Sequence, residues 1–296
     1  MPESDWAIIV HGGAKTIKAA LHQRNRDGCL GAAEAGAALL RAGGSALAAA
    51  QAAICVLEDD PLFNAGFGSV LNADGEVEMD AAIMNGTDLG VGAVAGVRRI
   101  RNPVTLAAAV LPAKPVLLAG EGAERFAMAN GIALCDARDM IAAERLASEY
   151  AKAHDTVGCV ALDVHGHIAA ATSTGGLPGK HPGRIGDSPI PGSGLYADDR
   201  LGGVAFSGDG ESILRTMLAA QVMQALTASP ADIAAQAAIT QLQRVGGEAG
   251  AIVIDATGRF GIAHNSEHFA LALHRSGWSE SKGAIHRNEL EMCLNE

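Results

Sequence analysis

The chain has few aromatic residues, little positive charge and no long uncharged apolar run. Aromatic residues make up 3% of the 296 residues while 49% are hydrophobic, so the core is expected to consist of closely packed Ala, Val, Leu and Ile. A formal net charge of -11 without a Lys/Arg cluster argues against a nucleic-acid partner. No apolar run reaches the roughly 18 to 20 residues that span a bilayer. We therefore expect a globular, soluble chain with no membrane partner.

Cysteine is scarce, and the pattern CxxC is missing. The cysteines are Cys29, Cys55, Cys135, Cys159 and Cys293. An odd number of widely spaced cysteines is typical of reduced thiols in a reducing compartment. The acidic start of the chain also shows no export-signal pattern. The expected location is the cytoplasm.

Hydrophobic patterning predicts helices and mainly antiparallel strands in both halves of the chain. Strands are expected at 6–10, 76–84, 89–97, 156–164, 168–174, 203–206, 251–255 and 260–264. Helices are expected at 28–40, 45–58, from 103 onward, at 211–227, and at 230–244 with Ser229 as its N-cap. The paired glycines at 11–14 permit either a tight turn or a close approach to the backbone, and a polar, helix-like linker is expected at 137–153. This mixture favours sheets packed face to face and covered by helices.

A polar His-Asp-Thr step opens into an apolar, β-branched run over residues 154–163. A threonine hydroxyl becomes an effective nucleophile when an adjacent N-terminal amine acts as its base, and that amine forms only if the preceding peptide bond is cut. Such an amine titrates near pH ~7.7 to 8.0, which suits a general base. The same pattern is typical of an ordinary strand start. These residues alone leave both interpretations of Thr156 open.

Three further segments carry residues suited to amino-acid chemistry. Arg184 and Asp187 lie in a loop rich in Gly and Pro, where a guanidinium can bind an α-carboxylate and a carboxylate can bind an α-ammonium; a surface ion pair is the alternative. The turn 207–210 can present N–H groups and a hydroxyl to a developing oxyanion. Thr174 ends the strand that is predicted to pair with the strand of Thr156. Its hydroxyl could face the hydroxyl or amine of Thr156, or Thr174 could be a structural threonine of the strand.

Six motifs, taken in order, resemble those of the N-terminal nucleophile hydrolases that act on asparagine derivatives. They are HGGA (11–14), PLFNAGFGS (61–69), HDTVG (154–158), ATSTGG (171–176), PGRIGDSPIPGSG (182–194) and SGDGES (207–212). The likeness is to the plant-type (type 2) L-asparaginases, which are also isoaspartyl peptidases, and to the related glycosylasparaginases. It implies an α+β fold, the four-layer αββα sandwich, as a single domain (1–296) that cleaves itself into an α chain (1–155) and a β chain (156–296).

The resemblance also implies a role for individual residues. Cleavage between Asp155 and Thr156 would make Thr156 the nucleophile of a threonine-type amidohydrolase. The other implied catalytic residues are Thr174, Asn64, Ser207 and Gly208, and the implied substrate-binding residues are Arg184, Asp187, Gly208 and Gly210. The family generally has threonine where this chain has Ser207. A looser oxyanion contact is therefore expected, because the methyl group that restricts the rotamer is missing.

The family resemblance further implies a ligand, an assembly and a substrate. No cofactor is expected for catalysis, and a structural sodium ion would be held by main-chain carbonyls. The residues that would provide these carbonyls are Leu57, Glu58, Asp60, Phe63, Ala65 and Phe67. The expected assembly is a dimer of αβ units, a heterotetramer. We expect cleavage of β-aspartyl dipeptides and L-asparagine with release of L-aspartate. A glycosylasparaginase and an uncleaved, non-catalytic amino-acid-binding protein are the alternatives.

Overall fold

A computed structural model describes residues 5–143 and 156–289 of the chain. Asp155, the expected cleavage residue, and most of the expected linker at 137–153 lie outside the described residues. The α-helices are α1 (His22–Arg41), α2 (Ala46–Asp59), α3 (Pro103–Val110), α4 (Gly120–Ala129), α6 (Gly210–Thr216), α7 (Leu218–Leu226) and α8 (Ala231–Gln241). Short 3₁₀ turns are η1 (Ala19–Leu21), η2 (Gly66–Gly68), η3 (Ala137–Met140) and η4 (Leu242–Arg244).

The strands form two sheets. Their bounds are β1 (Ala7–Lys15), β2 (Met79–Asn85), β3 (Val91–Val97), β4 (Leu117–Ala119), β5 (Thr156–Leu162), β6 (Ile168–Thr174), β7 (Leu195–Asp198), β8 (Gly202–Gly208), β9 (Ala249–Asp255), β10 (Phe260–His264), β11 (His268–Arg275) and β12 (Lys282–Ala284). The eight-stranded sheet has the order β12-β11-β1-β5-β6-β2-β3-β4, and the four-stranded sheet has the order β10-β9-β8-β7. Pairing is antiparallel except between β3 and β4.

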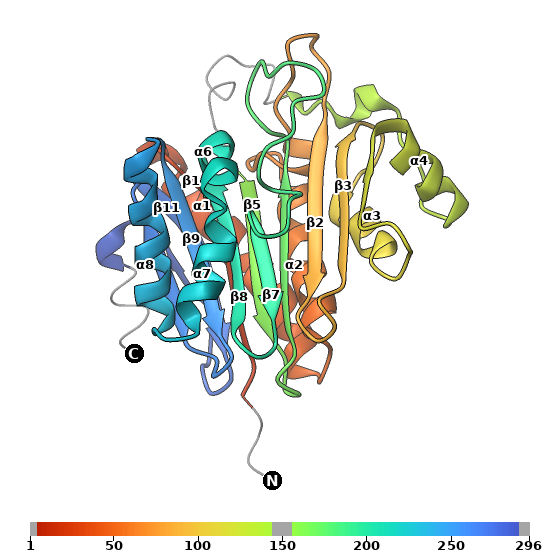
Figure 1. The fold of residues 1–296 in the computed structure, drawn as a ribbon. Coiled ribbons are helices and arrows are strands. Elements are labelled where there is room, and N and C mark those ends of the chain that lie inside the picture. The colour runs from red at the N-terminus through yellow and green to blue at the C-terminus, as the bar shows by residue number, and fades with distance from the viewer. Residues whose placement is uncertain (1–4, 144–155, 290–296) are drawn as a thin grey trace.

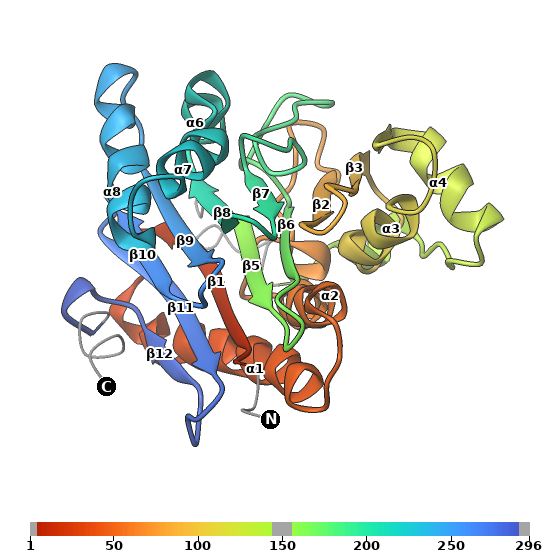
Figure 2. The ribbon, with the colours of Figure 1, turned by 60° about the horizontal axis from the view of Figure 1, so that its bottom comes forward.

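The two sheets pack face to face, and helices cover both outer faces (Figure 1). Figure 2 shows α7 and α8 above the small sheet and α1 and α2 below the large one. One apolar cluster joins α1, α2 and α3 to the large sheet, a second fills the space between the sheets, and a third joins the small sheet to α7 and α8. This is the expected αββα sandwich.

Small side chains allow the layers to approach closely. A Cβ atom at Gly36 of α1 would lie 2.2 Å from Cδ1 of Ile8 and 2.9 Å from the carbonyl oxygen of Ala49, so only glycine fits where α1 crosses β1 and α2. Helix α2 begins one residue after the expected start, because Ser45 is its N-cap: the Ser45 hydroxyl accepts a hydrogen bond from the Ala48 N–H at 3.2 Å. Scarce aromatics and abundant alanine thus agree with the observed packing.

The structure corrects several expectations about the elements. Of the two alternatives at 11–14 the structure shows the close approach and not the turn: a Cβ atom at Gly12 would lie 2.3 Å from Cε1 of Phe63. Strand β1 runs through these residues with a bulge between His11 and Gly13, whose φ is +115°. The helix expected at 211–227 is broken at Met217. Pro230, and not Ser229, occupies the N-cap position of α8. Elements that were not expected are β4, β7, β11, β12 and α4. In the described part of the chain, no helix combines the length and the apolar character needed to cross a membrane.

Candidate active site

Thr156 and Thr174 lie side by side where β5 begins and β6 ends. The two residues are direct partners in the antiparallel ladder, and both are buried. Directly opposite residues of such a pair have Cβ atoms about 4.5 to 5.5 Å apart on the same face of the sheet. The hydroxyl of Thr174 also accepts the N–H of Gly176 at 3.0 Å. The two threonines that the sequence singled out are therefore neighbours.

A small cavity at this end of the sheets collects most of the predicted site residues. It is lined by Thr156, Thr174, Gly176, Leu177, Arg184, Gly186, Asp187, Ser188, Gly208 and Gly210. The lining comes from β5, β6, the loop between β6 and β7, and the junction of β8 with α6. Of the predicted catalytic and substrate-binding residues, Ser207 and Asn64 are outside this lining. Segments distant in the sequence thus converge on one point.

Arg184 and Asp187 offer opposite charges to the cavity. One oxygen of the Asp187 carboxylate, Oδ2, is buried without a hydrogen-bond partner among the described residues. Burial raises the pKa of Asp187 to about 7. The guanidinium of Arg184 makes a two-pronged ion pair with Glu211, at 2.8 Å from Nε and 2.5 Å from the terminal nitrogen. A ligand ammonium would satisfy Asp187, and a ligand carboxylate would compete with Glu211 for Arg184.

Gly210 leaves the space between these two charges open. A Cβ atom at this position would lie 2.8 Å from a terminal nitrogen of Arg184 and 2.9 Å from Oδ1 of Asp187. Gly210 is the first residue of α6, and Asp209 caps that helix by accepting the Ser212 N–H. Its implied role in substrate binding therefore agrees with its position.

Ser207 contacts Thr156 although it does not line the cavity. Its Oγ accepts hydrogen bonds from the backbone N–H of Ala14 at 3.1 Å and from that of Thr156 at 3.3 Å. Two donors from different strands hold the Ser207 hydroxyl in one direction. These two hydrogen bonds restrict the rotamer of Ser207, as the methyl group of a threonine would do at this position.

Asn64 is tied to the chain just after Thr174. Its side-chain amide donates to the Gly176 carbonyl at 2.7 Å, its side-chain oxygen accepts from the Val70 N–H at 2.9 Å, and its own carbonyl accepts from the Gly175 N–H at 2.8 Å. These contacts join the segment after α2 to the end of β6. The structure therefore gives Asn64 a demonstrated part in supporting the loop behind the cavity.

Three of the six carbonyls expected to hold sodium lie beside the glycines of the turn η2. A Cβ atom at Gly66 would lie 2.5 Å from the Glu58 carbonyl oxygen, and one at Gly68 would lie 2.0 Å from that of Phe63 and 3.0 Å from that of Asp60. Backbone oxygens gathered around glycines are the donor set that a hard cation prefers. The chemistry of these three carbonyls fits the expected ion.

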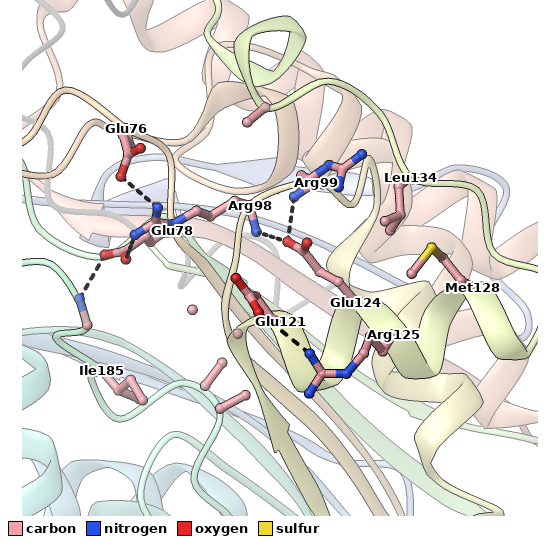
Figure 3. Close-up of a pocket in the computed structure, with 16 residues that line it drawn as sticks. Glu76, Glu78, Arg98, Arg99, Glu121, Glu124, Arg125, Met128, Leu134 and Ile185 are labelled. Carbon is pink, nitrogen blue, oxygen red and sulfur yellow. Dashed lines mark hydrogen bonds and ion pairs between the residues drawn. The ribbon is translucent and has the colours of Figure 1, made fainter.

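A much larger cavity, of about 870 Å³, is lined by residues of β3 and α4 and by Ile185 (Figure 3). Its charged side chains are largely paired with one another: Arg98 with Glu76 at 2.7 Å and with Glu78 at 2.8 Å, and Arg125 with Glu121 at 3.5 Å. Neither Thr156 nor Thr174 lines it. Because the predicted reactive groups meet in the smaller cavity, the larger one is not the candidate active site despite its size.

Sequence reasoning missed two buried groups beside the site. The Ser188 hydroxyl lies 3.0 Å from Oγ1 of Thr156. The Lys180 ammonium is buried and donates to the Glu78 carbonyl at 2.8 Å, and burial lowers the pKa of Lys180. Ser188 directly follows Asp187, so its place in the same motif was an available signal. Lys180 stands alone between glycine and histidine, where a solvated lysine is the ordinary expectation.

The structure also brings three histidines together near the start of α1. The ligand atoms of His22, His268 and His286 lie within 4.8 Å of one another. However, Nδ1 of His268 accepts the Ile17 N–H at 3.1 Å, so the proton of the neutral ring sits on Nε2. A ring in that state has no lone pair left for a metal ion. We therefore assign no metal to this cluster.

Comparison with known sequences identifies the family. A model of the family described as Asparaginase matches residues 4–153 and 137–282. The chain belongs to this family. The matched ranges include all the residues that line the small cavity.

Similar proteins are known from animals and bacteria. The chain is 42% identical over 287 residues to the isoaspartyl peptidase/L-asparaginase of Bos taurus, covering 91% of this chain and 93% of that protein. It is 43% identical over 274 residues to the mouse protein of the same name, covering 85% and 82%. It is 38% identical over 304 residues to the isoaspartyl peptidase of Salmonella typhimurium, covering 93% and 97%.

Proposed function

We propose that the protein is an isoaspartyl peptidase and L-asparaginase that releases L-aspartate. The observation that carries the proposal is the Asp187 oxygen, which has no hydrogen-bond partner among the described residues, in a cavity shared with Arg184 and Thr156. An aspartyl group presents an ammonium, an α-carboxylate and a side-chain carbonyl, and these three groups correspond to Asp187, Arg184 and Thr156. The names of the similar proteins support the same activity.

The reaction first requires the chain to cut itself. In this proposal the Thr156 hydroxyl attacks the Asp155 carbonyl, the acyl group moves from nitrogen to oxygen, and water hydrolyses the ester. This step leaves a single domain made of an α chain (1–155) and a β chain (156–296). The new amine of Thr156 can then act as the base for its own hydroxyl. Its nitrogen already lies 3.3 Å from the Ser207 hydroxyl.

Turnover then follows as acyl transfer. Oγ1 of Thr156 bonds to the β-carbonyl carbon of the substrate, and its proton passes through the amine to the leaving nitrogen. Ser207 and Gly208 stabilise the oxyanion. Water hydrolyses the β-aspartyl ester and releases aspartate. Arg184 and Asp187 hold the aspartyl group throughout, and this orientation can lower the barrier by several kcal/mol.

The remaining expectations are proposals of the same kind. No cofactor takes part in the chemistry, and a sodium ion held by the carbonyls at 57–67 would rigidify the loop that carries Asn64. The described cysteines Cys29, Cys55, Cys135 and Cys159 are free thiols, which supports a cytoplasmic location. The assembly is a dimer of αβ units, as the family resemblance implies. Analytical ultracentrifugation of the cleaved protein measures this mass directly.

Mass spectrometry of purified, aged protein tests the function. Wild type and Thr156→Ser are expected to yield two fragments, one that ends at Asp155 and one that begins at position 156, while Thr156→Ala stays intact. Thr240→Ala is the matched control, because Thr240 is an exposed threonine of α8 and should not affect cleavage.

Cleaved protein is then assayed with a β-aspartyl dipeptide, L-asparagine and glycosylasparagine. Preference for glycosylasparagine would replace the proposed substrate class. An intact wild type that still binds aspartate would make the chain a binding protein, and cleavage of Thr156→Ala would refute the assigned nucleophile.

A further inference from the structure

The side chain of Ser188 makes a direct contact with the proposed nucleophile. Its Oγ lies 3.0 Å from Oγ1 of Thr156, and either hydroxyl can be the donor. Ser188 is 1% exposed and Thr156 is 5% exposed, so water competes little for this hydrogen bond. Both residues line the small cavity.

The backbone of Ser188 is held firmly in place. The Thr172 hydroxyl donates to the Ser188 carbonyl at 2.7 Å, and Thr172 is two residues before Thr174 on β6. The loop also packs tightly on itself, since a Cβ atom at Gly194 would lie 2.8 Å from Cα of Ser188. Strand β6 therefore fixes the position from which the Ser188 hydroxyl reaches Thr156.

We propose that Ser188 is a positioning residue for the Thr156 hydroxyl, both in self-cleavage and in turnover. This inference rests on the proposed function, because it assigns Ser188 a role only if Thr156 is the nucleophile. A threonine hydroxyl at the end of a strand has more than one rotamer available. The contact with Ser188 selects the rotamer in which Oγ1 faces the cavity.

A hydroxyl is the suitable partner because it can both donate and accept. Before attack, Ser188 can accept the hydrogen bond of the Thr156 O–H. Once Oγ1 carries the acyl group, it has no proton, and Ser188 can donate to it instead. When water adds to the ester, the bond from the acyl carbon to Oγ1 breaks and Oγ1 regains a proton. Ser188 can stabilise the developing negative charge on Oγ1 during that step.

Three variants test this role. Ser188→Ala removes the hydroxyl. Ser188→Cys keeps a side chain of similar size, but its thiol is a weak hydrogen-bonding group. Ser193→Ala is the matched control, because Ser193 is a buried serine of the same loop outside the cavity lining. Each protein is followed for first-order cleavage by mass spectrometry, and its cleaved form is assayed for kcat and KM with a β-aspartyl dipeptide.

Ser188→Ala and Ser188→Cys are expected to slow cleavage and lower kcat by about tenfold each, which is the typical effect of one buried neutral hydrogen bond. KM should stay within about twofold, since Arg184 and Asp187 still hold the substrate. Ser193→Ala should behave as wild type.

Other outcomes separate the two proposals. Cleavage and kcat of Ser188→Ala at wild-type values would overturn the role of Ser188 while leaving the proposed function intact. Equal slowing in Ser193→Ala, or a wild-type rate in Ser188→Cys, would show that the loop needs only its packing. A wild type that neither cleaves nor turns over substrate would refute the proposed function, and the role of Ser188 with it.

Discussion

Replacing Gly210 by alanine tests whether the aspartyl group binds between Arg184 and Asp187. The added methyl group would lie 2.8 Å from a terminal nitrogen of Arg184 and 2.9 Å from Oδ1 of Asp187. The cavity has a volume of only about 10 Å³, roughly that of a single water probe. Ligand entry therefore already requires side chains to move. The Arg184–Glu211 pair is suited to open, because the Glu211 side chain is 53% exposed.

The expected loss follows from the contacts that the methyl group blocks. A hydrogen bond to a charged group contributes about 1.5 to 3 kcal/mol. Blocking one of the two contacts to the substrate, the carboxylate on Arg184 or the ammonium on Asp187, should cost about 2 kcal/mol. This corresponds to a fall of roughly 30-fold in kcat/KM. Self-cleavage should continue, because Gly210 has no role in the attack of Thr156 on the preceding peptide bond.

The assay compares kcat/KM of cleaved Gly210→Ala with that of wild type and of Gly31→Ala. Gly31 is an exposed residue of α1, and a Cβ atom there meets nothing within 4 Å. Its replacement should leave activity unchanged and favour the helix slightly. Thermal melting confirms that each variant is folded. A kcat/KM for Gly210→Ala within threefold of wild type would refute the proposed binding mode.

Three further predictions concern pH, competition and packing. Burial raises the pKa of Asp187 from 3.8 to about 7, so kcat/KM should rise as the pH rises to 7, and Asp187→Asn should lose this rise. Because the carboxyl group ionises near pH 4 in the unfolded chain and near pH 7 in the folded one, the folded state loses stability as the pH rises from about 4 to 7. The melting temperature of wild type should therefore fall more over this range than that of Asp187→Asn. Glu211→Gln should lower KM by about threefold, because the Glu211 carboxylate competes with the substrate carboxylate for Arg184 and glutamine binds Arg184 more weakly. An unchanged KM would contradict this competition. Gly158→Ala should destabilise the fold, because the added Cβ would lie 2.2 Å from Nε2 of His11. The expected cost is about 2 kcal/mol, which lowers the melting temperature by roughly 5 °C. An unchanged melting temperature would show that His11 can move.

The sequence predicted regular elements well where pattern and local chemistry agree. Strands β6 and β10 have the predicted bounds, and each end of α2 lies within one residue of the predicted range 45–58. The break at Met217 could not be predicted, because no glycine or proline marks it. It depends on a distant loop: the carbonyls of Ser193 and Gly192 accept the N–H groups of Ala219 and Ala220, which would otherwise bond within one continuous helix.

In the candidate site, too, some residues were predictable from the sequence and others were not. Motifs pointed to Thr156, Thr174, Arg184 and Asp187, and the fold brings them to one cavity. The contact between Ser188 and Thr156 was missed, since residues 32 positions apart meet only through the pairing of β5 with β6 and the support of the loop by β6. Contacts of this kind depend on register and loop path, which single-sequence patterns do not specify.

The order of strands in the large sheet determines what would happen to the two pieces after the proposed cleavage that follows residue 155. Strands β1, β2, β3 and β4 precede that bond, and β5, β6, β11 and β12 follow it. In the sheet the strands of the two pieces form alternating groups, β12–β11, β1, β5–β6 and β2–β3–β4, so ladders β11–β1, β1–β5 and β6–β2 each join one piece to the other. Separating the pieces would expose three strand interfaces and a shared apolar core at once. The cut chain should therefore behave as one cooperative unit that cannot exchange its halves with another molecule without unfolding, and the cleavage site can form only after both halves have folded together.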